Sequence, residues 1–201
     1  MHIRRDIGGE RGYSLIELMM VVGIMGVLSG IAVAQLTTTR GNLRGDAAMR
    51  VVLSTLNSAK QMAMTQRRYM RVTFDATNTQ ISIVREDTTT TTTTVSTVIF
   101  EGNAKFQLMA GLPDTPDAFG NSAATAFTNS VNGTFASATG TNNVIKFGPD
   151  GTLVDWNGNA TNGTVFTAIP NANPSARAVT VMGSTGRVRG YKWDGRQWVR
   201  V

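Results

Sequence analysis

An uncharged stretch near the N-terminus, from Leu18 to Leu36, constrains this chain more than any other feature of its sequence. Its length is close to the ~20 apolar residues that a helix needs to cross a bilayer. Glu17 stands directly before it, and an ionised group in a membrane helix costs at least about 2.5–3.5 kcal/mol at the helix centre. Such a carboxylate needs a cationic partner, because an unpaired buried charge is strongly destabilising. We therefore predict a membrane helix over 13–36 that does more than anchor the chain.

The residues before this stretch form a short basic segment. Residues 1–12 contain Arg4, Arg5 and Arg11, and positive residues stay on the cytoplasmic side of a membrane. A secretory signal would carry its small-residue cleavage site after the apolar core, whereas here Gly12 precedes it. We interpret residues 1–12 as a leader peptide, and an ordinary signal anchor with an incidental glutamate is the alternative.

The motif Gly12-Tyr13-Ser14-Leu15-Ile16-Glu17-Leu18 resembles the processing motif of type IV pilins and type II secretion pseudopilins, with Tyr13 where phenylalanine is usual. The resemblance implies cleavage between Gly12 and Tyr13 by a prepilin peptidase, followed by methylation of the Tyr13 amine. It also implies that Glu17 faces the Tyr13 ammonium of a neighbouring subunit during assembly. The partners implied are the prepilin peptidase, other pilins or pseudopilins in a filament, and the bacterial inner membrane, with the C-terminal domain in the periplasm.

Composition argues against an enzyme. The 201 residues include no cysteine, and the single histidine, His2, lies in the leader. The mature chain therefore has no thiolate, no histidine base and no histidine metal ligand. Asp150, Asp155, Asn157 and Asn159 match no calcium-loop spacing and suit turns. We predict no cofactor and no metal site; a membrane-anchored enzyme with a carboxylate or Ser/Lys mechanism is the remote alternative.

A helical apolar pattern resumes after the membrane segment. Residues 37–45 are polar and contain Gly41 and Gly45, which predicts a weak or bent helical link. Apolar residues then recur every three or four positions and predict an amphipathic continuation over 37–69 that packs on a sheet; they are Met49, Val52, Leu56, Ala59 and Ala63.

In the rest of the chain, apolar and polar residues alternate as they do in the strands of a β domain. We predict strands at 70–74, 80–84, 95–100, 105–109, 143–147, 152–154, 163–169, 176–182, 187–193 and 196–201, with a polar loop at 88–94 and a long variable loop at 111–143. The predicted fold class is α+β: a long N-terminal helix packed on antiparallel sheets, with residues 70–201 as the β-rich domain. Residues 46–74, 147–151 and 179–189 resemble the GspH/FimT-type minor pilins and pseudopilins, which implies a type IV pilin-like fold.

The C-terminal residues carry a basic excess. Six cationic side chains stand against Asp194 alone; they are Arg177, Arg187, Arg189, Lys192, Arg196 and Arg200. A two-residue turn at Asp194-Gly195 would pair Trp193 with Arg196, Tyr191 with Trp198 and Arg189 with Arg200. One hairpin face would then carry four arginines beside three aromatic rings: Arg187, Arg189, Arg196, Arg200, Tyr191, Trp193 and Trp198. Guanidinium groups suit phosphates and rings can stack on bases.

Two interpretations of this face stay open. The aromatic side chains can be the core face that seals the sheet against the helix, with the arginines solvated at the strand ends. Alternatively the face binds DNA, and Gly186-Arg187-Val188-Arg189 resembles the G-R-x-R element that FimT-type minor pilins use in natural transformation. The predicted function is accordingly a minor pilin or pseudopilin that supports protein secretion or pilus assembly, with a DNA-binding minor pilin as the alternative.

Overall fold

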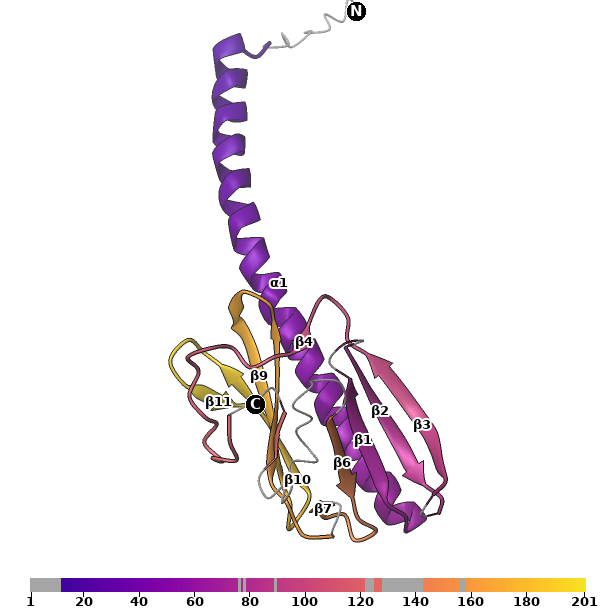
Figure 1. Ribbon diagram of the computed structural model, residues 1–201. Helices are drawn as coiled ribbons and strands as arrows, with labels where there is room; N and C mark the ends of the chain where they lie inside the picture. Colours follow the sequence, from indigo (N-terminus) through magenta and orange to yellow (C-terminus); the bar gives the residue numbers. More distant parts are fainter. Residues whose placement is uncertain are drawn as a thin grey trace, which may run out of the picture. The chain divides into compact units, whose positions relative to one another are not determined.

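The structure is a computed structural model that describes residues 12–75, 77, 79–88, 90–121, 125–127, 143–155 and 158–201. It forms two compact units, residues 1–39 and 40–201. A helix, α1 (Leu15–Gln66), contributes to both (Figure 1). The predicted leader lies outside the described residues except for Gly12.

In the second unit, α1 is the centre of the core. The five predicted stripe residues are at most 1% exposed, which confirms the stripe. The predicted link is helical through Gly41 and Gly45. Gly45 is required there, because a Cβ at this position would lie 2.5 Å from the carbonyl oxygen of Ser175. The helix therefore packs directly on backbone at its entry into the domain.

The helix ends at Gln66, three residues earlier than predicted. Arg67 adopts φ 50°, and the Arg68 amide donates to the carbonyl oxygen of Ala63 at 3.2 Å. This arrangement closes a helix end with a left-handed residue, a position that usually belongs to glycine.

Two antiparallel sheets flank α1 (Figure 1). The five-stranded sheet has the order β3-β2-β1-β6-β7, with β1 Met70–Asp75, β2 Gln80–Glu86, β3 Thr92–Ile99, β6 Asn143–Phe147 and β7 Leu153–Val154. The six-stranded sheet has the order β11-β10-β9-β8-β4, with β5 also on β8; its strands are β4 Lys105–Phe106, β5 Thr125–Phe127, β8 Gly163–Ile169, β9 Ala172–Met182, β10 Arg187–Trp193 and β11 Trp198–Arg200. The predicted α+β class, with one long helix on antiparallel sheets, is confirmed.

The six-stranded sheet is buried on both faces. On one face Val165, Val179 and Val181 join the helix stripe and the inner residues of the other sheet. On the opposite face Phe166, Ala178 and their neighbours form a second cluster, because side chains alternate along a strand. This second cluster is covered by the segment 107–121, named here the strap.

Several boundaries differ from the prediction. β3 begins at Thr92, inside the predicted polar loop, because threonine is β-branched and pairs well in strands even without apolar alternation. β4 is two residues long rather than five. The predicted loop 111–143 contains β5 and, at its start, ordered strap with a buried Thr115; most of its remainder lies outside the described residues.

Candidate functional site

The N-terminal motif forms the first turn of α1. The Ser14 carbonyl oxygen accepts hydrogen bonds from the amides of Glu17, at 3.0 Å, and Leu18, at 3.1 Å. This places the Glu17 carboxylate in the first turn, where the helix dipole favours a negative charge. Tyr13 and Glu17 are four residues apart and, with Leu18 and Val21, line one hollow of about 280 Å³. Tyr13 and the predicted assembly residue Glu17 therefore share one side of the helix start.

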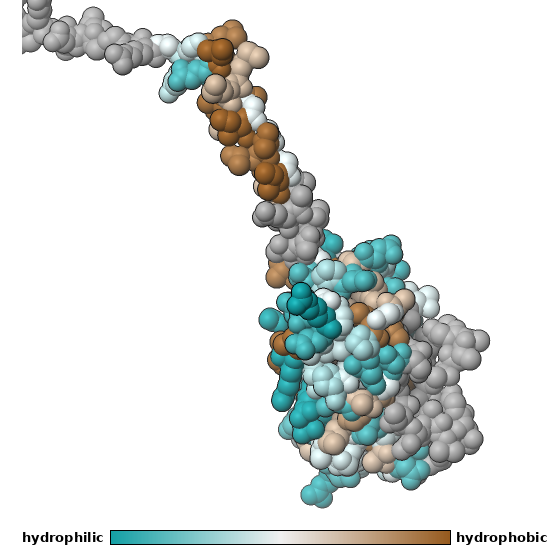
Figure 2. Space-filling model, turned by 90° about the vertical axis from the view of Figure 1, so that its left-hand side faces the viewer, coloured by the Kyte–Doolittle hydropathy of each residue, from teal (hydrophilic) through white to brown (hydrophobic). Residues whose placement is uncertain are grey.

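The first unit exposes a continuous apolar surface. Leu15–Ala32 is the one helical segment of the described chain that is long and apolar enough to cross a membrane, and none of it is buried. Figure 2 shows hydrophobic side chains along the face of this segment that it draws. A patch of this size is unfavourable in water and indicates membrane anchoring.

The C-terminal hairpin has a different register from the one predicted. β10 pairs Tyr191 with Arg200 and Trp193 with Trp198, so the turn contains four residues rather than two. Asp194 closes it: its Oδ1 accepts from the amides of Arg196, at 2.7 Å, and Gln197, at 2.8 Å. A shift of two residues keeps every strand side chain on its face. The predicted face is therefore retained, except that Arg196 lies in the turn.

The aromatic residues of this face are largely core. Tyr191 is 3% exposed and Trp198 is 7% exposed, and Trp193 packs against them half-buried. The indole nitrogen of Trp198 donates to the Pro113 carbonyl oxygen at 2.8 Å. They pack under the strap and not on the helix, as the core interpretation had it, because the helix-facing positions of β10 are the even-numbered ones, such as Gly190 beside Leu53. Tyr191 is thus not available for base stacking in this arrangement.

Arg189 on the same face is held by a carboxylate of the strap. Asp117 Oδ1 accepts from Arg189 Nη1 at 2.7 Å, while Oδ2 accepts from the hydroxyls of Tyr191, at 2.9 Å, and Thr180, at 2.6 Å. Burial alone raises the pKa of Asp117, but these three hydrogen bonds outweigh it and hold the pKa below its ordinary value. Burial and the Asp117 charge raise the pKa of the Tyr191 hydroxyl. Asp117 was not among the predicted site residues, because it lies in the segment 111–143 that was predicted to be a variable loop.

The remaining basic residues do not form one patch. Arg187, Arg196 and Arg200 are exposed, but Arg187 begins β10 and Arg196 lies beyond its other end. A seven-residue strand separates them by roughly 20 Å. Arg177 is fully buried, and its Nε donates to Asp46 Oδ1 at 2.6 Å, which fastens β9 to α1. Some of the C-terminal basic residues therefore form ion pairs within the domain, as Arg177 and Arg189 do, and others are exposed at its surface.

Within the described ranges, no three acidic, histidine or cysteine side chains are grouped as metal ligands. Asp150 Oδ1 accepts from the amide of Thr152 at 3.1 Å, and Asp155 Oδ1 accepts from the amide of Asn159 at 2.8 Å. These contacts close turns, as expected for both aspartates; Asn157 lies outside the described residues.

Comparison with known proteins bears on the N-terminal site. Residues 8–33 match the family model described as the prokaryotic N-terminal methylation motif. Among solved structures, the type IV minor pilin FimU of Pseudomonas aeruginosa strain PAO1 is similar at a TM-score of 0.47 and 14% identity, over 77% of this chain and 91% of that one. No curated protein matches the sequence. The chain thus carries the prokaryotic N-terminal methylation motif, and its resemblance to type IV pilins and pseudopilins is supported at Gly12 to Leu18.

Proposed function

We propose that the chain is a minor pilin or pseudopilin subunit of a type IV filament or a type II secretion pseudopilus, a structural subunit and not an enzyme. A prepilin peptidase cleaves it between Gly12 and Tyr13, the new amine is methylated, and the protein inserts in the bacterial inner membrane with residues 40–201 in the periplasm. It then enters a filament, at or near the tip, through the first part of α1.

The observation that carries this proposal is the methylation motif at residues 8–33 on a helix whose apolar surface is unburied. A simple anchor would explain the apolar surface but not a carboxylate in its first turn. Cleavage before Tyr13 creates an ammonium group at the same end of the helix. An ammonium on one subunit and the Glu17 carboxylate on the next would pair in lipid, where a lone charge is costly.

Replacement of Glu17 tests the assembly step. In the native cell, Glu17→Ala should insert in the membrane as well as wild type, because removing the charge favours insertion, but its amount in sheared filaments or cross-linked oligomers should fall at least about tenfold. Glu17→Asp, which keeps the charge, is the matched control and should retain most of the assembly. If Glu17→Ala assembles like wild type, the pairing of Glu17 with a neighbouring amine is wrong.

A second candidate is DNA binding by the C-terminal hairpin, as in DNA uptake. The exposure of Arg187, Arg196 and Arg200 supports it. The ion pair between Arg189 and Asp117 and the burial of Tyr191 weigh against the complete predicted face. A mobility-shift titration of wild type against Arg187→Ala/Arg189→Ala decides it: salt-sensitive binding that the double variant loses supports a hairpin site, and no binding at low salt eliminates it.

A further inference from the structure

Each sheet of residues 40–201 ends in a strand whose outer side is open. β3 is the outermost strand of the five-stranded sheet and β11 of the six-stranded sheet, and among the described residues no further strand pairs with either. Figure 1 shows the two strands on opposite sides of this unit. An open edge presents amide and carbonyl groups that a strand from another molecule can use.

On β3, the backbone groups of Thr97 and Ile99 point to the open edge. The Phe100 amide donates to the Thr79 carbonyl oxygen at 2.9 Å, so the backbone of Phe100 points to β2. Successive residues of an antiparallel strand point alternately to its two sides. Val98 therefore also points to β2, and the two residues beside it point outward.

The regular part of the β3 edge is short and lacks the usual protection. An open edge is commonly protected by charged residues, proline or a bulge. Residues 92–99 contain no charge and no proline, and their bulge at Val95 leaves a regular edge at 96–99. This edge is similar in length to β11, which spans Trp198–Arg200.

On β11, the backbone groups of Trp198 and Arg200 point to the open edge. The Val201 amide donates to the Gly190 carbonyl oxygen at 3.0 Å, so the backbone of Val201 points to β10. By the same alternation, Val199 points to β10 and its two neighbours point outward. Each edge therefore offers two outward residues with one inward residue between them.

β3 and β11 run in opposite directions along α1. β3 ends near Arg44, because a Cβ at Gly102, three residues after the strand, would lie 2.8 Å from Arg44 Cδ. β11 begins after the turn at Asp194, which lines a hollow together with Asn42, and it runs toward the level of Leu53. Two copies of this unit that point the same way therefore present β3 and β11 to each other as antiparallel strands.

We propose that β3 of one copy of the chain pairs with β11 of a neighbouring copy and joins their sheets. The register that uses all four outward residues is Thr97–Arg200, Val98–Val199 and Ile99–Trp198. The first and last pairs exchange backbone hydrogen bonds, and the middle pair faces across the ladder without them. Because the two edges are different surfaces, each copy can bind two neighbours and the contact can repeat.

The apolar side chains agree with this register. Val199 is 43% exposed, and Val98 is half-buried at the margin of the core. Their contact across the ladder removes apolar surface of both from water. Ile99 is 62% exposed and is covered in part by the added strand.

The charges also favour β3–β11 pairing over pairing of two identical edges. Continuing the register places the exposed Glu101 opposite the exposed Arg196, although the nearby Asp194 carboxylate weakens this attraction. Arg200 faces an uncharged strand. Pairing of β11 with β11 would instead bring arginines of two copies together, and pairing of β3 with β3 requires copies that point in opposite directions.

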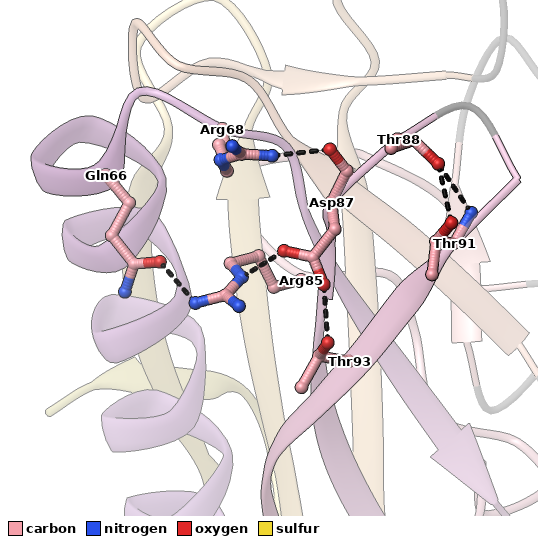
Figure 3. A network of polar contacts seen from close by, with 7 residues as sticks. All are labelled: Gln66, Arg68, Arg85, Asp87, Thr88, Thr91 and Thr93. Carbon is pink, nitrogen blue, oxygen red and sulfur yellow. Dashed lines mark hydrogen bonds and ion pairs between the residues drawn. The ribbon is translucent and has the colours of Figure 1, made fainter.

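β3 is held in place at both ends before any partner binds. At its start, Thr93 donates to the Asp87 carboxylate, which also accepts from Arg85 at 2.6 Å (Figure 3). Arg85 in turn donates to Gln66 Oε1 at 3.3 Å, which fastens the β2–β3 turn to the end of α1. After its end, Phe100 is buried in the core. A preformed edge loses little chain entropy on association.

Disulfide cross-linking tests the contact directly, because the chain contains no cysteine. Full-length Val98→Cys and Val199→Cys chains with different tags are produced together in the native cell, and their membranes are treated with a mild oxidant. Facing residues without hydrogen bonds have Cα atoms about 4.5 Å apart, within reach of a disulfide. The mixed dimer should exceed the dimer of either variant alone at least about fivefold, and the double variant should form larger oligomers.

Ser96→Cys is the matched control for the register. Ser96 is half-buried on the same face of β3 as Val98, two residues earlier. In the proposed register it lies diagonal to Val199, about 7–8 Å away, which is too far for a disulfide. Together with Val199→Cys it should therefore give roughly a third or less of the mixed dimer that Val98→Cys gives.

Proline at position 97 tests the backbone hydrogen bonds. The Thr97 amide points to the open edge, where proline is tolerated, so Thr97→Pro should keep a urea midpoint close to that of wild type. In the Val98→Cys chain it should lower the mixed dimer at least about fivefold, because it removes an amide donor from the ladder. Thr97→Val loses the same hydroxyl, which lies 3.0 Å from that of Ser82, but keeps the amide and should cross-link fully.

The pairing is overturned if the mixed dimer does not exceed that of the single variants, if Ser96→Cys gives an equal yield, or if Thr97→Pro changes nothing. Strong dimer formation by Val98→Cys alone would overturn it in favour of β3–β3 pairing. The inference rests on the proposed function only in that filament subunits point the same way. A chain that begins at Tyr13 but does not cross-link would therefore reject this contact alone, whereas a cross-linked chain that retains residues 1–12 would contradict only the proposed function.

Discussion

The Asp117 carboxylate holds the strap on the six-stranded sheet through hydrogen bonds to β9 and β10. Its replacement should therefore lower the stability of the domain. Asp117→Ala removes three charge-assisted hydrogen bonds, which its carboxylate accepts from Arg189 and from the hydroxyls of Tyr191 and Thr180. A hydrogen bond to a charged group contributes about 1.5–3 kcal/mol, and bonds that share one carboxylate contribute less than their sum. The side chains of Asp117 and Arg189 are 12% and 23% exposed, so solvent screens them only in part. We therefore expect a loss of about 3 kcal/mol in the free energy of unfolding.

The free energy of unfolding of a domain is typically about 5–15 kcal/mol, so this loss is a large part of it. The protein should nevertheless remain folded at room temperature. Urea unfolding followed by tryptophan fluorescence measures it, since Trp193 and Trp198 lie in the cluster under the strap. The midpoint should fall with little change in m, because the surface exposed on unfolding is unchanged. Glu101→Ala, which removes an exposed carboxylate, is the control and should change the free energy by less than about 0.5 kcal/mol. Equal midpoints for Asp117→Ala and Glu101→Ala would refute the Asp117 network.

Three further predictions follow from buried contacts. Because folding lowers the pKa of Asp117, its contribution should be present above the unfolded pKa of about 3.9 and disappear as pH falls through the folded pKa. Urea midpoints of wild type and Asp117→Asn should therefore differ at about pH 7 and converge as pH falls below the folded pKa. Gly186→Ala should cost about 2 kcal/mol or more, and Gly158→Ala only about 1 kcal/mol, because both have positive φ but only the former meets a backbone oxygen; equal thermal shifts would contradict this. Asp46→Ala should cost about 3 kcal/mol by leaving the buried Arg177 without a carboxylate, and a loss under about 1 kcal/mol in chemical unfolding would show that the pair is solvated.

The helix stripe and most strands could be predicted because each depends on local periodicity. Met49 to Ala63 repeat every three or four residues, and all five predicted residues are in the core. The face of Tyr191 and Trp198 was also predictable, since any register shift of two residues preserves it. Their burial was one of two open interpretations, because alternation does not say which face of a sheet is covered.

The register of the last hairpin and the cover of its face could not be predicted from local sequence. Asp194-Gly195 favours a two-residue turn, but the Asp194 carboxylate also binds two amides across a four-residue turn, and that turn brings Trp193 opposite Trp198. Asp117 lies 72 positions from Arg189, so no sequence pattern connects them. The candidate DNA-binding residues were therefore identified by residue type, whereas the availability of Arg189 and Tyr191 depends on a carboxylate far away in the sequence.

The mature N-terminus is the most direct test of the central claim, that this chain is processed like a type IV pilin. Mass spectrometry of the protein purified from membranes or filaments of its native cell reads the first residue and its modification. The account predicts a chain that begins at Tyr13 and carries one methyl group on its α-amine. A protein that retains residues 1–12, or that is cleaved after the apolar stretch near Leu36, would contradict it.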